Sequence, residues 1–193
     1  MRRRQGGGKR TLRLSGGAFR GRKLKVGQDL RPTEGRVREA LFSIWGAQLQ
    51  NAQLLDLFAG SGAISLEGEG RGAGEVVAVD QRTNLLEENL AAVGSRRVEV
   101  LRGEVVAVLK RLRSEPIPPT FQLVFADPPY GYRAYDDLLT AVGPLLAAAG
   151  ELVLEHSARR PMPSKVPALL QVDERRYGET VLSFYRPNGG GQG

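Results

Sequence analysis

The feature that most constrains this sequence is a regular alternation, from residue 51 onward, of short apolar runs with amphipathic segments. The apolar runs are typical of buried strands and comprise 53–58, 75–80, 98–101, 121–126 and 151–156. The segments between them predict helices at 82–94, 104–113 and 133–148, and a further helix after the glycine turn that follows the first run. Such alternation predicts an α/β fold with a doubly wound, mostly parallel, Rossmann-like sheet.

The end of the chain departs from this alternation. LLQVDERRYGETVLSFYR predicts two strands that turn near Gly178, which would add an antiparallel edge hairpin to the sheet. We therefore expect one main domain over 51–187. The glycine-rich residues 188–193 are expected to form a disordered tail.

Residues 11–50 predict a small N-terminal extension. TLRL (11–14) and AFRGRKLKV (18–26) alternate apolar with cationic side chains, as short strands around a turn would. Thr33 is suited to cap a helix over 34–49, and Trp45 lies on the apolar stripe of that helix, where we expect it to be core. The sequence therefore predicts a hairpin and a helix ahead of the main domain.

Positive charge is concentrated in the first 38 residues, which hold 13 of the 28 basic residues and 2 of the 21 acidic residues. Arg36 and Arg38 lie on the predicted polar face of the helix. This asymmetry predicts a polyanionic partner, nucleic acid above all. The alternative is a disordered basic tail, expected over residues 1–10, that only adds solubility.

Several classes of site are excluded by composition. The chain has no cysteine, which excludes disulfides, thiolate zinc sites, iron–sulfur clusters and a cysteine nucleophile. His156 is the single histidine, so we expect no metal centre and interpret His156 as a surface residue. No stretch reaches the ~20 apolar residues that a membrane span requires, so we expect no membrane partner and a cytoplasmic location.

A glycine turn follows the first predicted strand. Gly60 and Gly62 would let the backbone approach a ligand closely, and Asp80 ends the next strand, where a carboxylate can accept both ribose hydroxyls of an adenosine cofactor. Ser65 replaces the third glycine of the dinucleotide fingerprint, and Asp56 would repel a pyrophosphate but suit an amine or a sulfonium. The alternative is that Asp56 caps the amides of the turn itself.

FADPPY ends the fourth predicted strand. Asp127 would lie at the same sheet edge as the glycine turn, because ligands bind at the carboxyl ends of parallel strands. Pro128 and Pro129 stiffen the backbone and remove two amide donors, and Tyr130 could stack on a planar ring. This combination predicts a site for an exocyclic amine. The alternative is a tight turn whose aspartate caps the next helix.

DLFAGSG, the aspartate at the end of the second strand and DPPY together resemble the class I S-adenosylmethionine-dependent amino-methyltransferases. GGAFRGRKL and LRPTEGRVREALFSIW resemble, more specifically, the bacterial small-subunit (16S) ribosomal RNA guanine-N2 methyltransferases. The resemblance covers nearly all of residues 11–186. It implies methyl transfer from S-adenosylmethionine to the N2 amine of a guanine in small-subunit ribosomal RNA, either free or in a partly assembled subunit, by a monomer.

The resemblance also implies roles for individual residues. The cofactor would be held by Asp56, Phe58, Ala59, Gly60, Gly62 and Asp80, with Glu104 where the family pattern has a short polar residue near the adenine. The target base would be held by Asp127, Pro128, Pro129 and Tyr130. RNA phosphates would be bound by Arg20, Arg22, Lys23, Arg31, Arg36 and Arg38.

Other functions remain open at this point. DPPY is shared with DNA adenine-N6 and protein glutamine-N5 methyltransferases. A nucleic-acid-binding module without catalysis and a nicotinamide-dependent oxidoreductase are further alternatives, although the serine at the third glycine position argues against the oxidoreductase.

Overall fold

The computed structural model describes residues 10–27 and 34–189. Arg31 and Thr33, and nearly all of the two expected tails, lie outside the described residues. The strands are β1 (Thr11–Arg13), β2 (Lys23–Lys25), β3 (Gln53–Leu57), β4 (Glu75–Asp80), β5 (Val98–Arg102), β6 (Phe121–Ala126), β7 (Leu146–Ser157), β8 (Lys165–Val166), β9 (Leu169–Tyr177) and β10 (Thr180–Pro187). The helices are α1 (Glu34–Trp45), α2 (Ala63–Gly70), α3 (Asn84–Val93), α4 (Val105–Arg113) and α5 (Tyr135–Val142), with 3-10 turns at Gly46–Leu49 and Gly143–Leu145.

Eight strands form the central sheet in the order β5-β4-β3-β6-β7-β10-β9-β8. The five strands from β5 to β7 are parallel to one another, and β10, β9 and β8 pair antiparallel. The predicted doubly wound sheet and the C-terminal antiparallel hairpin are both confirmed. The strand order reverses direction between β3 and β6, which is where ligands bind in open α/β sheets.

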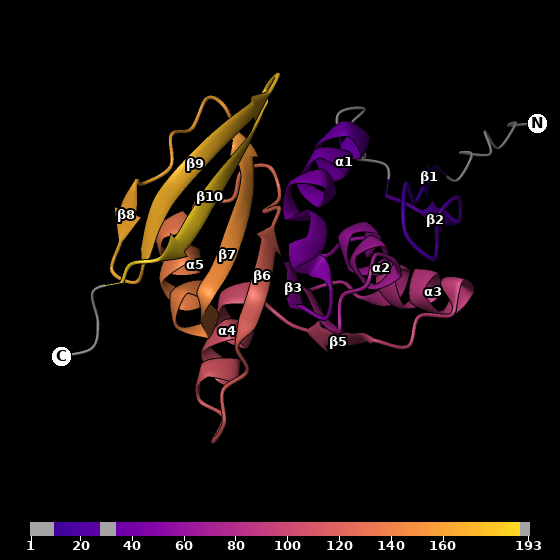
Figure 1. Ribbon diagram of the computed structural model, residues 1–193, viewed down its shortest axis with the longest axis horizontal. Helices are drawn as coiled ribbons and strands as arrows, with labels where there is room; N and C mark the ends of the chain where they lie inside the picture. The colour runs from indigo at the N-terminus through magenta and orange to yellow at the C-terminus, as the bar shows by residue number, and fades with distance from the viewer. Residues whose placement is uncertain (1–9, 28–33, 190–193) are drawn as a thin grey trace, which may run out of the picture.

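Helices cover both faces of the sheet (Figure 1). On one face, α4 and α5 pack onto side chains such as Leu55 and Leu57 of β3. On the other face, α1 packs onto Leu54 and onto Val153 of β7. Successive leucines of β3 therefore pack into apolar clusters on opposite faces of the sheet. Burial on both faces explains why β3 is a continuous apolar run in the sequence.

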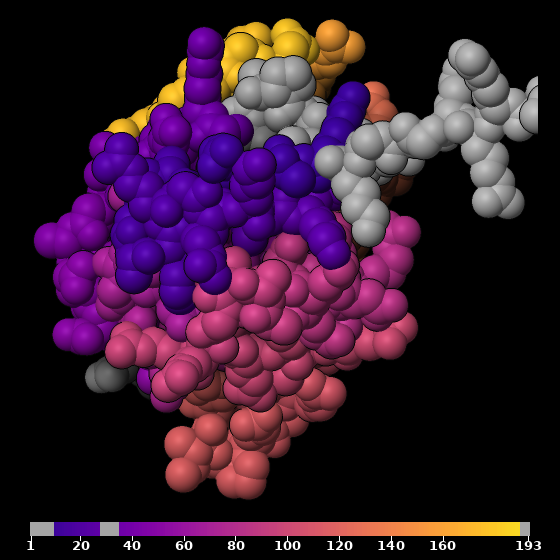
Figure 2. Space-filling model, turned by 90° about the vertical axis from the view of Figure 1, so that its right-hand side faces the viewer, coloured from indigo at the N-terminus to yellow at the C-terminus, as the bar shows by residue number. Residues whose placement is uncertain are grey.

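The N-terminal hairpin shares its core with the main domain. Leu14 and Leu24 are buried in one cluster with Leu86 and Leu90 of α3, and the backbone N–H of Ala18 donates to the carbonyl of Gly70 at the end of α2. Figure 2 shows the hairpin, in indigo, lying directly on the magenta surface of these helices.

No helix within the described parts of the chain is long and apolar enough to cross a membrane.

Some predicted boundaries were wrong. The helix expected over 133–148 ends at Val142, because Pro144 cannot donate a helical hydrogen bond, and β7 then starts five residues earlier than predicted. The helix expected over 34–49 tightens into a 3-10 turn after Trp45. That residue is fully buried, as expected.

Glu67 of α2 is a fully buried carboxylate that joins three segments. It accepts a hydrogen bond from Arg38 Nε of α1 at 2.8 Å, from Arg71 Nη2 at 2.7 Å, and from the backbone N–H of Ser15 at 3.2 Å. Burial alone would raise the pKa of Glu67, but the hydrogen bonds from Ser15 and Arg71 outweigh it and hold the pKa below its usual value.

The prediction that Arg38 lies on the solvent face of its helix was wrong. Arg38 is 6% exposed, its charge is paired with Glu67, and its Nη2 donates to the carbonyl of Arg13 in the hairpin. The glutamate that turns this arginine inward lies 29 residues away in the sequence, so helix periodicity alone could not reveal it.

We expect Glu67→Ala to lower the free energy of unfolding by about 3–5 kcal/mol, because it leaves the buried charge of Arg38 without its partner. Urea unfolding followed by circular dichroism measures the effect. Glu87→Ala, at an exposed position of α3, is the matched control and should stay within about 0.5 kcal/mol of wild type. Equal stabilities for the two variants would contradict the joining role of Glu67.

Candidate functional site

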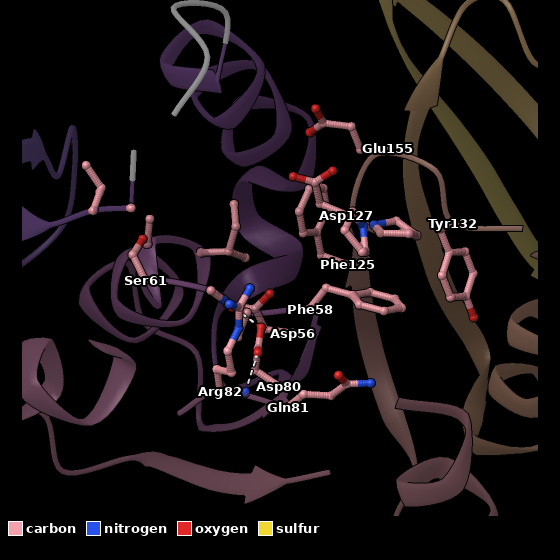
Figure 3. Close-up of a pocket in the computed structure, with 18 of the residues that line it drawn as sticks. Asp56, Phe58, Ser61, Asp80, Gln81, Arg82, Phe125, Asp127, Tyr132 and Glu155 are labelled. Carbon is pink, nitrogen blue, oxygen red and sulfur yellow. Dashed lines mark hydrogen bonds between the residues drawn. The ribbon is translucent and has the colours of Figure 1, made fainter. Parts of the chain in front are cut away.

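A cavity of about 890 Å³ opens at the carboxyl ends of the parallel strands (Figure 3). It extends from Glu104 beyond β5, across Asp56 of β3, to Asp127 beyond β6 and Glu155 in β7. Leu12, Val26 and Gly27 of the N-terminal hairpin form part of its wall. The structure therefore brings the glycine turn and the DPPY segment into one cavity, as the sequence predicted.

The turn after β3 has a left-handed backbone. Phe58, Gly60 and Gly62 have φ of 61°, 55° and 78°, and a Cβ on Gly62 would approach Leu86 Cδ1 to 2.3 Å. Both the positive φ of Gly62 and the close approach of Leu86 therefore favour glycine at this position. Phe58 holds the same conformation without being glycine, which is typical of strained functional turns.

Asp80 fixes this turn from the neighbouring strand. One carboxylate oxygen accepts from the backbone N–H of Gly60 at 2.9 Å, and the other accepts from the backbone N–H of Arg82 at 2.8 Å. The bond from Arg82 is local, the bond from Gly60 joins the ends of β3 and β4, and the carboxylate still borders the cavity. Each oxygen keeps a further lone pair, so Asp80 can accept additional hydrogen bonds from a ligand.

Asp56 bears on both alternatives that the sequence left open. Its Oδ2 accepts hydrogen bonds from the backbone N–H of Ser65 at 3.0 Å and from the Ser65 hydroxyl, so it caps the first turn of α2 rather than the amides of the glycine turn itself. It also lines the cavity. Burial raises the pKa of Asp56 to about 7, although the hydrogen bonds from Ser65 oppose the shift, and the charges of Asp80 and Asp127 add to it.

Glu104 is the N-cap residue of α4. Its two carboxylate oxygens accept from the backbone N–H groups of Val106 at 3.1 Å and Ala107 at 2.8 Å. Capping explains why a carboxylate occurs at this position. The side chain also lines the cavity, at the end opposite Glu155. The family resemblance implies an adenine contact at the Glu104 end.

The DPPY loop lies at the mouth of the cavity. Asp127 is half-buried and Pro128 buried, whereas the Tyr130 side chain is 99% exposed. Tyr132 packs edge-on against the ring of Phe58, with ring centroids 5.3 Å apart. Arg160 anchors the residues that follow DPPY, donating to the carbonyl of Tyr132 at 2.9 Å.

Sequence reasoning missed several residues of the cavity, among them Glu155, Arg82 and Phe125. Glu155 is the penultimate residue of the strand predicted over 151–156, and its place near the carboxyl end of that strand was the available signal. The interpretation of His156 as a surface residue was wrong: it is 6% exposed, and its ring nitrogens contact the Ser157 carbonyl at 3.1 Å and Ser183 Oγ at 2.8 Å. Burial accordingly lowers the pKa of His156.

The predicted phosphate-binding residues divide into three groups. Arg20, Arg22, Lys23 and Arg36 are exposed. Arg22 also donates to the carbonyls of Ala92 and Val93 at the end of α3, at 3.0 and 3.2 Å, which anchors the hairpin. Arg38 is buried and paired, as described above, and Arg31 is outside the described residues.

Comparisons with known proteins agree with this geometry. The family model described as Conserved hypothetical protein 95 matches residues 12–186. The protein named ribosomal RNA small subunit methyltransferase D of Escherichia coli K12 is 30% identical, over 96% of this chain and 94% of its own length.

Two solved structures resemble more than nine-tenths of the chain. A candidate methyltransferase from Escherichia coli superposes with a TM-score of 0.79 at 26% identity, covering 92% of this chain and 98% of its own. A hypothetical protein from Thermus thermophilus superposes with a TM-score of 0.77 at 32% identity, covering 91% and 99%.

The raised pKa of Asp56 predicts that the ionisation of this carboxyl lowers the stability of the native state by an amount that depends on pH. Between pH 4 and about 7 the unfolded carboxyl ionises while the native one keeps its proton, so the native state binds more protons and its stability falls as pH rises. We expect Asp56→Asn to remove this loss. The variant should gain stability relative to wild type across that window, by up to about 4 kcal/mol.

Urea unfolding at a series of pH values measures this difference. Ser65→Ala is the companion variant: it removes a hydrogen bond that lowers the pKa of Asp56, so the loss of stability should extend to higher pH. A constant difference between Asp56→Asn and wild type at every pH would contradict the assignment.

Proposed function

The chain belongs to the family described as Conserved hypothetical protein 95, together with the Escherichia coli ribosomal RNA small subunit methyltransferase D, and on this premise we propose a specific reaction. The protein transfers the methyl group of S-adenosylmethionine to the exocyclic N2 amine of a guanine in small-subunit ribosomal RNA. The observation that carries the proposal is the single cavity that holds both the glycine turn and Asp127-Pro128-Pro129-Tyr130.

The half of the cavity beyond β3, β4 and β5 suits the cofactor. Asp80 is placed to accept the ribose hydroxyls, and Gly60 and Gly62 allow close backbone approach. The carboxylate of Asp56 favours a cationic amine or sulfonium, and Glu104 lies where an adenine amine would need an acceptor. When bound, S-adenosylmethionine supplies an electrophilic methyl group on its sulfonium.

The half of the cavity beyond β6 and β7 suits the acceptor base. The Asp127 carboxylate and the Pro128 carbonyl are acceptors for the two hydrogens of an exocyclic amine, and the exposed ring of Tyr130 is available to stack on the base. Holding both hydrogens directs the nitrogen lone pair toward the methyl group. As the N–C bond forms and the S–C bond breaks, Asp127 or water takes the amine proton.

Mass spectrometry of nucleosides tests the reaction, after incubation of the protein with S-adenosylmethionine and small-subunit RNA or partly assembled subunits. We expect N2-methylguanosine from the wild type and a loss of roughly 100-fold or more in rate for Asp127→Ala. Asp136→Ala, at an exposed position of α5 outside the cavity, is the control. N6-methyladenosine in DNA, or methylated protein glutamine, with no product in RNA would favour the alternatives.

The N-terminal hairpin and α1 are proposed to position the RNA. Arg20, Arg22, Lys23 and Arg36 are exposed on these elements, and the hairpin itself forms part of the cavity wall. Leu12 and Val26 of the hairpin reach the cavity, whereas Arg22 is anchored at the C-terminal end of α3, so RNA phosphates would meet these cations along the hairpin, leading away from the cavity. Arg31 lies outside the described residues, and we include it in this proposal on the basis of the sequence alone.

Replacing Arg20 and Lys23 with alanine should weaken RNA binding and flatten its salt dependence. Two lost phosphate contacts should reduce the slope of log K against log salt by about 1.4 on single-stranded RNA. Fluorescence anisotropy of a labelled ribosomal RNA fragment measures the slope between roughly 50 and 200 mM salt. Lys110→Ala with Arg113→Ala removes equal charge from exposed positions of α4, on the opposite face of the sheet, and should leave the slope unchanged.

A further inference from the structure

The acceptor half of the cavity contains a second carboxylate, that of Glu155 (Figure 3). β6 and β7 are parallel, and Ala126 pairs with Leu154, so Asp127 and Glu155 follow at the same level of neighbouring strands. Phe125 and Val153, two residues earlier in each strand, pack in one cluster, which places both carboxylates on the same sheet face. Glu155 is nevertheless 6% exposed.

We propose that Glu155 determines base specificity by accepting the N1–H of guanine, while Asp127 holds the adjacent N2 amine. The inference rests on the proposed function. On its Watson–Crick edge guanine presents N1–H beside the amine, whereas adenine and 2,6-diaminopurine present a lone pair at N1. An ionised carboxylate only accepts hydrogen bonds, so it stabilises guanine and repels the lone pair of the other purines.

The position of Glu155 distinguishes it from the other carboxylates of the cavity. Asp56, Asp80 and Glu104 lie at the cofactor end, and each accepts hydrogen bonds from backbone amides. Glu155 lies one strand beyond Asp127, on the side away from the cofactor turn. A carboxylate has about four acceptor positions, so its contacts within the protein are compatible with one more donor from the base.

The burial of Glu155 supports the same role. A carboxylate buried at a ligand cavity loses hydration, and a donor on the correct base would replace it. A base with a lone pair at this position instead faces a carboxylate oxygen, and sites built around such a hydrogen bond reject analogues strongly. Recognition and rejection would therefore come from the same side chain.

The test compares two RNA substrates after the methylated position has been identified by mass spectrometry. One fragment carries guanine at that position, and the other carries 2,6-diaminopurine, which keeps the N2 amine but has a lone pair at N1. We expect wild type to prefer guanine by roughly 10- to 100-fold in kcat/KM. Glu155→Gln should reduce this preference to less than about threefold, because an amide can donate or accept.

The ratio separates specificity from structural damage, because partial misfolding lowers activity on both substrates alike. Glu151→Gln is the matched control: Glu151 is also a buried carboxylate of β7, but it pairs with Arg186 outside the cavity. It should keep the wild-type ratio. Glu155→Asp retains an acceptor, so it should keep a preference for guanine at lower kcat/KM, and it serves as the second variant if Glu155→Gln does not fold.

The outcomes distinguish a failure of the role of Glu155 from a failure of the proposed function. If wild type forms N2-methylguanosine and Glu155→Gln keeps its preference for guanine, the role of Glu155 is wrong and the proposed function stands. A Glu155→Asp variant that accepts both substrates equally would also contradict the inference. If wild type forms no N2-methylguanosine, the proposed function fails, and this inference fails with it.

Discussion

The hydrogen bonds and ion pairs of the buried Glu67 carboxylate join α1, α2 and the N-terminal hairpin, and the hairpin forms part of the cavity wall. The carboxylate connects α2 to α1 through Arg38 and to the N-terminal hairpin through Ser15, and the hairpin supplies Leu12 and Val26 to the cavity wall. The partners compensate for the desolvation of the carboxylate, and removing one of them would leave a buried charge uncompensated. The N-terminal segment is thereby held against the central sheet and its helices.

Much of the site could be predicted from the sequence because its parts are local and end at strand termini. The alternation of strands and helices predicts a parallel sheet, and such a sheet brings Asp56, Asp80 and Asp127 to one edge whatever the details of packing. The left-handed turn at Gly60 and Gly62 likewise follows from residue type. Local chemistry and topology were sufficient for these features.

The features that sequence reasoning missed depend on contacts between distant residues. Arg38 has the periodicity of a solvent-facing residue and is turned inward by Glu67. His156 has no nearby histidine in the sequence, but Ser183 of β10 accommodates its ring in the sheet. Glu155 is adjacent to Asp127 only because β6 pairs with β7 in a particular register. Neither hydrophobic period nor residue spacing contains that information.

Charge is separated between the cavity and the surface beside it. Five carboxylates and two arginines, Arg38 and Arg82, line the cavity, so its formal balance is negative. Exposed cations on the adjoining hairpin have the opposite sign. A phosphate backbone would be repelled by the cavity and attracted to the hairpin, while a cationic cofactor and the donor-rich edge of guanine would be drawn inward. In the proposed reaction, the same electrostatic arrangement would therefore hold the nucleic acid backbone outside the cavity and favour entry of the cofactor and the base.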